Sequence, residues 1–171
     1  SFIEFDKNLA KISILGDCEV VIKYLDGSIK RFYNESLSKL DNVALDEMIR
    51  LSSESNLPLI ECRPLISDTL IKHRRLINHE SGYKAYTLGL DKLLFDEYEL
   101  SLNNVQEIYL YSDGFSQNFQ HLQIYNSYLE LFQKSLDLNM EIKKIVERAF
   151  SDKSCDKYPR FKVIDDITII K

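Results

Sequence analysis

The sequence of 171 residues contains no tryptophan, only three cysteines, three prolines and five glycines, and no long apolar run. Cys18, Cys62 and Cys155 are far apart and odd in number, so they form neither a CxxC metal pair nor a disulfide framework. We therefore expect a reducing, cytoplasmic setting. Because no apolar run approaches the roughly 18 residues that a membrane-spanning helix needs, we expect no membrane partner.

Positive charge is also in short supply. Lys and Arg number 22 against 27 Asp and Glu, which gives a net charge of −5 at pH 7. An acidic chain is repelled by phosphate backbones, so we expect no nucleic-acid partner. The hydrophobic share of 44% and the charged share of 29% are ordinary for one globular domain with a sizeable core. We therefore treat residues 1–171 as part of a single domain.

Strand-forming runs are separated by turn residues. The sequence Asp6-Lys7-Asn8 joins one predicted pair of strands, and Asp26-Gly27 joins the next pair, where glycine tolerates a positive φ. The predicted strands are 2–5, 9–15, 20–25, 28–32, 83–88, 94–100, 105–111 and 167–170.

Helical spacing of apolar residues occupies the rest of the chain. It predicts a helix over 37–51 with Ser36 as N-cap, and others over 67–76, 119–132 and 142–149. Two prolines, Pro58 and Pro64, predict an extended stretch between them. Strands and helices are grouped in blocks, and neighbouring strands are joined by hairpins. This grouping favours an α+β fold with antiparallel sheets over a doubly wound parallel sheet.

Three acidic spots lie at the ends of apolar strands. Asp17 follows one strand, Asp113 follows another, and the pair Asp165-Asp166 directly precedes the last strand. Carboxylates gathered at strand ends form an oxygen-rich pocket suited to hard cations such as Mg²⁺ or Mn²⁺. Glycine neighbours, Gly16 and Gly114, let the backbone turn sharply and let another group approach. Taken one at a time, each spot is better interpreted as an ordinary turn, because Asp and Gly are the commonest turn residues.

Taken in order, these motifs resemble those of the metal-dependent serine/threonine protein phosphatases of type 2C, in a bacterial-like branch. Gly16-Asp17-Cys18 resembles the family's GDS motif, YLYSDGF at 109–115 resembles LLxxSDGL/F, and IDDITII at 164–170 resembles DNITVIVV or DDATV. A further stretch of that branch, RR…N…GGYW, is similar to His73-Arg74-Arg75, Asn78 and Gly82-Tyr83. By its residues alone, the basic cluster at 73–75 is interpreted as a solvated helix end.

The resemblance implies a fold and a site. The fold is an antiparallel β-sandwich flanked by helices. The metal ligands are Asp113 and Asp165 at a centre of two Mg²⁺ or Mn²⁺ ions, and Asp17, which helps to hold a third ion. Gly16, Gly114 and Asp166 adjoin these ligands. The implied reaction is hydrolysis of phosphoserine or phosphothreonine in a phosphoprotein substrate by a metal-activated water.

Departures from the family pattern leave two hypotheses open. The family's N-terminal segment supplies a phosphate-binding arginine, an acidic ligand and a DG motif that bridges both metals, and this sequence has no counterpart. Cys18 also stands where the family usually has serine. We expect residues 1–171 to be the C-terminal portion of such a phosphatase domain, without its N-terminal strands and ligands. The alternative is a catalytically inactive, phosphatase-like binding or regulatory module, and a third is an unrelated α+β interaction domain.

Overall fold

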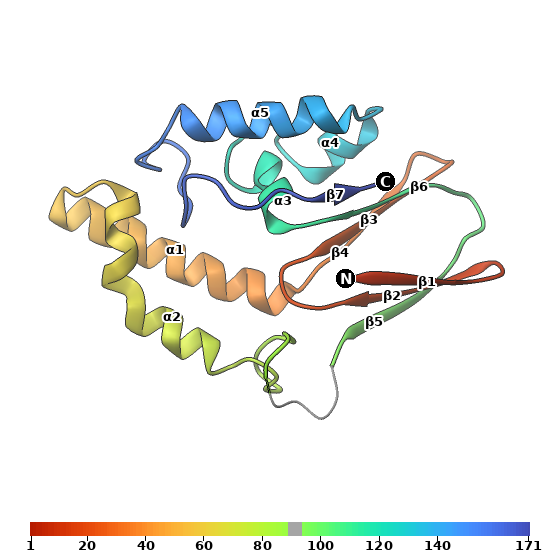
Figure 1. The fold of residues 1–171 in the computed structure, drawn as a ribbon, viewed down its shortest axis with the longest axis horizontal. Coiled ribbons are helices and arrows are strands. Elements are labelled where there is room, and N and C mark those ends of the chain that lie inside the picture. Colours follow the sequence, from red (N-terminus) through yellow and green to blue (C-terminus); the bar gives the residue numbers. More distant parts are fainter. Residues whose placement is uncertain (89–93) are drawn as a thin grey trace.

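A computed structural model describes residues 1–88 and 94–171, which form two antiparallel sheets and five α-helices (Figure 1). The three-stranded sheet has the order β1-β2-β5 and consists of Phe2–Asp6, Leu9–Ile14 and Asp96–Ser101. The four-stranded sheet has the order β4-β3-β6-β7 and consists of Ile29–Phe32, Glu19–Tyr24, Val105–Tyr111 and Ile169–Ile170. The predicted α+β class with antiparallel sheets is confirmed.

The helices follow the strands in blocks. They are α1 (Glu35–Ser55), α2 (Ser67–Arg74), α3 (Asp113–Gln120), α4 (Tyr128–Gln133) and α5 (Leu138–Phe150), with a 3₁₀ helix η1 (Leu59–Ile66) between α1 and α2. In the part of the chain that the structure describes, none of these helices combines the length and apolarity that crossing a bilayer requires.

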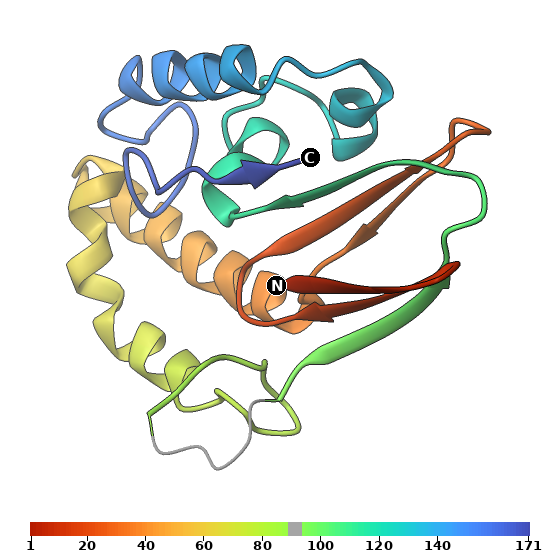
Figure 2. The ribbon, with the colours of Figure 1, turned by 45° about the vertical axis from the view of Figure 1, so that its right-hand side comes forward.

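The two sheets pack against each other through their apolar faces (Figure 2). Ala10, Ile12 and Ile14 of β2 point to one face and are fully buried, and the two isoleucines pack with Val20 and Ile22 of β3. The strand period of two puts every second side chain on the same face, which explains this pairing. The sandwich core therefore runs between β2 and β5 on one side and β3 and β6 on the other.

A second core lies on the opposite face of the four-stranded sheet. Tyr109 and Tyr111 of β6 project from that face and pack against α3, α4 and α5, and the ring of Phe132 of α4 contacts both tyrosine rings. Figure 1 shows these three helices on one side of the sheet. This packing fixes the position of α3, and the first residue of α3 is the predicted metal ligand Asp113.

Helix α1 belongs to a third cluster. Ala44 and Met48 on its buried face pack with η1 and with Cys155 of the C-terminal loop. The helix begins after Asn34, whose side chain accepts a hydrogen bond from the backbone N–H of Leu37 at 2.9 Å. The predicted cap, Ser36, is wrong, because the helix starts at Glu35, two residues before its apolar pattern.

Helices cover only one outer face of the sandwich in the residues that the structure describes. The predicted flanking by helices therefore holds only for the four-stranded sheet. The outer face of the three-stranded sheet carries partly exposed residues such as Phe2, Leu9 and Lys11, and α1 packs on η1 instead.

Three local predictions are wrong. Residues 83–88 form no strand, because the side chain of Asn78 bonds both the N–H and the C=O of Ala85, at 3.2 and 3.0 Å, and so takes the groups that a ladder would use. The stretch between Pro58 and Pro64 is largely 3₁₀ helix. The helix predicted over 119–132 is divided into α3 and α4, because Gln123 has a φ of 50° and Ser127 caps α4.

Candidate functional site

The three predicted metal ligands line one cavity. Asp17, Asp113 and Asp165 all contribute to the wall of a cavity of about 290 Å³, although they come from the turn after β2, the start of α3 and the segment before β7. Gly16 also lines this cavity. The structure thus brings together the side chains that the sequence placed far apart.

The pairing of β6 with β7 explains why Asp113 and Asp165 meet. The two strands are antiparallel neighbours, with Tyr111 opposite Ile169, so residues that follow β6 lie beside residues that precede β7. Ser112 locks this junction. Its backbone N–H donates to the carbonyl of Thr168 at 3.0 Å, and its hydroxyl donates to the carbonyl of Asp166 at 2.9 Å while accepting from the N–H of Thr168 at 3.0 Å.

Glycine at position 114 allows the two segments to touch. A Cβ built there would lie 2.2 Å from the carbonyl oxygen of Asp166, far inside van der Waals contact. The space beside Gly114 is therefore filled by the backbone of Asp166. The side chain of Asp166 is exposed, and its contribution to the junction comes from its carbonyl. Asp166 thus adjoins the site through its backbone.

Gly16 supplies the turn that carries Asp17. Its φ is +69°, in the left-handed region that side-chain-bearing residues rarely adopt, and its N–H donates to the carbonyl of Lys84 at 2.8 Å. The turn places Asp17 at the rim of the cavity, where the residue is exposed.

Burial and the charges of neighbouring carboxylates shift the pKa values of the aspartates in the cavity. Burial, together with the charges of Asp17 and Asp165, raises the pKa of Asp113 to about 6. Burial acts in the same direction on Asp165, but hydrogen bonds from Lys162 and the backbone outweigh it and lower the pKa of Asp165. The neighbouring carboxyl group of Asp113 contributes to the same lowering. A carboxylate whose pKa is raised by burial and by like charges gains from a nearby proton or cation.

A fourth carboxylate, Asp41 of α1, was not found from the sequence. It lines the cavity, and burial together with the charge of Asp17 raises its pKa to about 6, although the residue keeps contact with solvent at the rim. Asp41 lies four residues from both Leu37 and Leu45, which line the same cavity. A charged residue inside an apolar helical stripe was the signal in the sequence.

Arg31, Arg160 and Lys162 also line the cavity, and each forms an ion pair with a carboxylate. Arg31 donates to Glu19 at 2.6 and 2.8 Å. Glu19 in turn accepts from the hydroxyl of Tyr111 at 2.8 Å and from the amide of Gln120 at 3.0 Å. The guanidinium of Arg31 is 4.1 Å from the ring centre of Tyr33. This buried cluster forms a rigid wall, because every member is held by at least one other.

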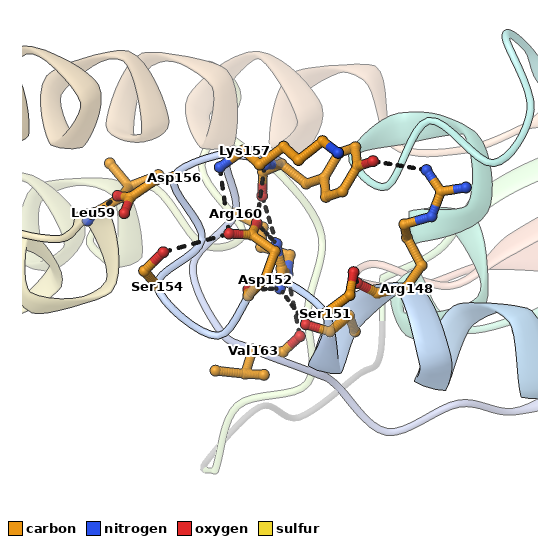
Figure 3. A network of polar contacts seen from close by, with 11 residues as sticks. Leu59, Arg148, Ser151, Asp152, Ser154, Asp156, Lys157, Arg160 and Val163 are labelled. Carbon is orange, nitrogen blue, oxygen red and sulfur yellow. Dashed lines mark hydrogen bonds and ion pairs between the residues drawn. The ribbon is translucent and has the colours of Figure 1, made fainter.

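Arg160 holds the loop between α5 and β7, which contains Asp165, through several hydrogen bonds (Figure 3). The side chain is 1% exposed and pairs with Asp152 at 2.9 Å. Its other hydrogen bonds go to backbone carbonyls of Ala149, Asp152, Tyr158 and Val163. The guanidinium therefore ties the end of α5 to the segment directly before Asp165.

The donor set fits a hard cation in chemistry. None of the ion pairs in residues 1–88 and 94–171 involves Asp17, Asp41 or Asp113, so three carboxylates share the cavity without a basic partner. Gln117, one turn after Asp113, lines the cavity and has a buried amide oxygen without a hydrogen-bond partner. Oxygen donors of these kinds are the ligands that Mg²⁺ and Mn²⁺ prefer. Over the same described ranges, no group of three or more His, Cys, Asp or Glu side chains is arranged so that it could hold a metal ion.

Comparison of the chain with protein-family models, with curated proteins and with solved structures finds no match. The geometry of the cavity is therefore the guide to function. Its central elements are the Asp113–Asp165 junction, the nearby carboxylates Asp17 and Asp41, and the paired basic side chains of the wall.

Proposed function

We propose that residues 1–171 form part of a metal-dependent protein serine/threonine phosphatase domain similar to type 2C, which hydrolyses phosphoserine or phosphothreonine. The observation that carries the proposal is the convergence of Asp113 and Asp165 in one cavity, with Asp17 close enough to raise the pKa of Asp113. The order of the three motifs along the chain supports the same assignment.

The chain's own residues would hold the cation and keep the site in shape. Asp113 and Asp165 supply carboxylate oxygens from two segments that Ser112 holds together. Asp17 adds negative charge at the rim, and Asp41 faces it from α1. When bound, Mg²⁺ or Mn²⁺ supplies polarisation of water and of phosphoryl oxygens. A phosphorylated side chain is anionic, so the carboxylates alone would repel it, and neutralising them is the condition for substrate binding.

A second candidate function is a phosphatase-like module that binds without catalysis. The specific observation that favours it is the contact between Lys162 and Asp165, in which an internal cation already neutralises a proposed ligand. Under this hypothesis the cavity is a structural relic, and divalent cations have no effect on its stability.

Hydrolysis of a phosphopeptide with Mn²⁺, measured on the full-length protein, tests the proposal. We expect Asp113→Asn and Asp165→Asn each to lower the rate by at least about 100-fold, because even residues that only support metal ligands are worth about 10- to 100-fold. Asp166→Asn is the matched control, since its side chain is exposed and only its carbonyl contacts the site. Equal activity in Asp113→Asn and in the wild type contradicts the proposal. A folded protein that neither hydrolyses the phosphopeptide nor is stabilised by Mn²⁺ supports the non-catalytic module.

A further inference from the structure

Lys162 stands in contact with a proposed cation ligand. Its ammonium nitrogen lies 2.8 and 2.6 Å from the two carboxylate oxygens of Asp165, and both residues line the cavity. Because the ammonium contacts both oxygens, it occupies a position in which a cation could also contact the carboxylate. A divalent cation bound there and the ammonium would exclude each other, because like charges at such short range repel strongly.

Asp165 is fixed in place independently of Lys162. The backbone N–H of Asp166 donates to its carboxylate at 3.0 Å, and the carbonyl of Asp166 is held by the hydroxyl of Ser112. Asp165 is also little exposed, with 17% of its side chain accessible to solvent. The carboxylate therefore stays at the cavity when its ammonium partner leaves.

Lys162 can leave without any movement of the backbone. The backbone around Lys162 is held by a hydrogen bond, because the guanidinium of Arg160 donates to the carbonyl of Val163 at 3.1 Å. The Lys162 side chain itself is 45% exposed and flexible, so rotation about its own bonds carries the ammonium into solvent. A fixed carboxylate thus faces a movable cation.

We propose that Lys162 is an internal counter-ion that competes with a divalent cation for Asp165 and so lowers the affinity of the site for it. The inference rests on the proposed function, because it requires that Asp165 bind the cation. In the cation-free protein, Lys162 neutralises one of the five carboxylates that line the cavity, which are Asp17, Glu19, Asp41, Asp113 and Asp165. On cation binding, the ammonium moves to the rim.

Titration of the full-length protein with Mn²⁺ in a calorimeter tests this competition. We expect Lys162→Met to bind Mn²⁺ about five-fold more tightly than the wild type, which corresponds to a partly exposed ion pair of about 1 kcal/mol. Lys162→Arg keeps the positive charge and should bind as weakly as the wild type. Lys143→Met is the matched control, because Lys143 forms an exposed ion pair with Glu147 on α5 and does not line the cavity.

The outcomes separate this inference from the proposed function. If Asp165→Asn weakens Mn²⁺ binding while Lys162→Met binds like the wild type or more weakly, the cation site stands and the competition is refuted. If the wild type binds no Mn²⁺, or if Asp165→Asn binds it unchanged, both the site and the competition are refuted. The thermal midpoint of each variant without Mn²⁺ confirms that it is folded, and Lys162→Gln serves as a second neutral variant.

Discussion

Replacement of Gly114 by alanine tests how the two halves of the site are held together. Gly114 lies in the first turn of α3 and has no positive φ, so helix propensity alone predicts that alanine stabilises the protein by up to about 1 kcal/mol. The structure predicts the opposite sign. The new Cβ would lie 2.2 Å from the carbonyl oxygen and 2.8 Å from the carbonyl carbon of Asp166, and both are backbone atoms that no side-chain rotation can move.

The loss of stability in Gly114→Ala can be worked out from the contacts that the new methyl group disturbs. Relief of the overlap costs about 1–3 kcal/mol, as for other overpacked positions. Moving Asp166 away also weakens its hydrogen bond with Ser112, at about 0.5–1.5 kcal/mol. After subtraction of the propensity gain, we expect a net loss of about 2 kcal/mol. For a domain of this size that loss lowers the thermal midpoint by about 4–8 °C.

Thermal unfolding followed by circular dichroism measures the effect, with Gly27→Ala as the matched control. Gly27 has a φ of +83° but no atom near the added Cβ, so its replacement introduces backbone strain without a steric clash. We expect Gly27→Ala to leave Mn²⁺ binding unchanged and Gly114→Ala to weaken it, because only Gly114 lies between the proposed ligands. A Gly114→Ala variant that is as stable as the wild type and binds Mn²⁺ equally well would refute the reasoning.

Two further predictions concern the cavity wall. Arg31→Met should lower the free energy of unfolding by about 3–5 kcal/mol in urea titrations, because it leaves the buried carboxylate of Glu19 without its partner. The double variant Arg31→Met with Glu19→Gln should recover part of that loss. A double variant that recovers none of it would contradict the pairing. Burial lowers the pKa of His121, so the unfolded state binds the proton more readily, and stability should be lost as the pH falls through about 6.5. The unfolding free energy of His121→Gln, measured from pH 5 to 8, should lack this contribution, and a His121→Gln profile parallel to that of the wild type would contradict it.

Local patterns in the sequence were sufficient to predict most of the strands and to identify the acidic motifs. The turn at Asp26-Gly27 joins β3 and β4 as expected, and Asp17 and Asp113 lie shortly after β2 and β6. The reason is that strand alternation and turn residues act over a few neighbouring positions. Asp165 lies four residues before β7, because the last strand begins at Ile169 and not at Ile167 as predicted.

Features that depend on distant contacts could not be predicted. Asn78 prevents a strand at 83–88 by bonding Ala85, a contact for which no periodic pattern exists. Asp41 reaches the cavity only because α1 packs beside it, and the contact of Lys162 with Asp165 depends on the conformation of a loop in which Arg160 bonds the carbonyl of Val163. These contacts determine the electrostatics of the site, and they depend on the folded arrangement of the chain.

Diffraction from a crystal of the protein soaked in Mn²⁺ tests the central claim most directly. The anomalous signal of manganese locates the ion without any assumption about its ligands. Our account predicts a peak in the cavity, within coordination distance of one carboxylate oxygen each of Asp113 and Asp165, with the Lys162 ammonium displaced. The absence of a peak in the cavity at saturating Mn²⁺, or a peak bound by neither carboxylate, would contradict it.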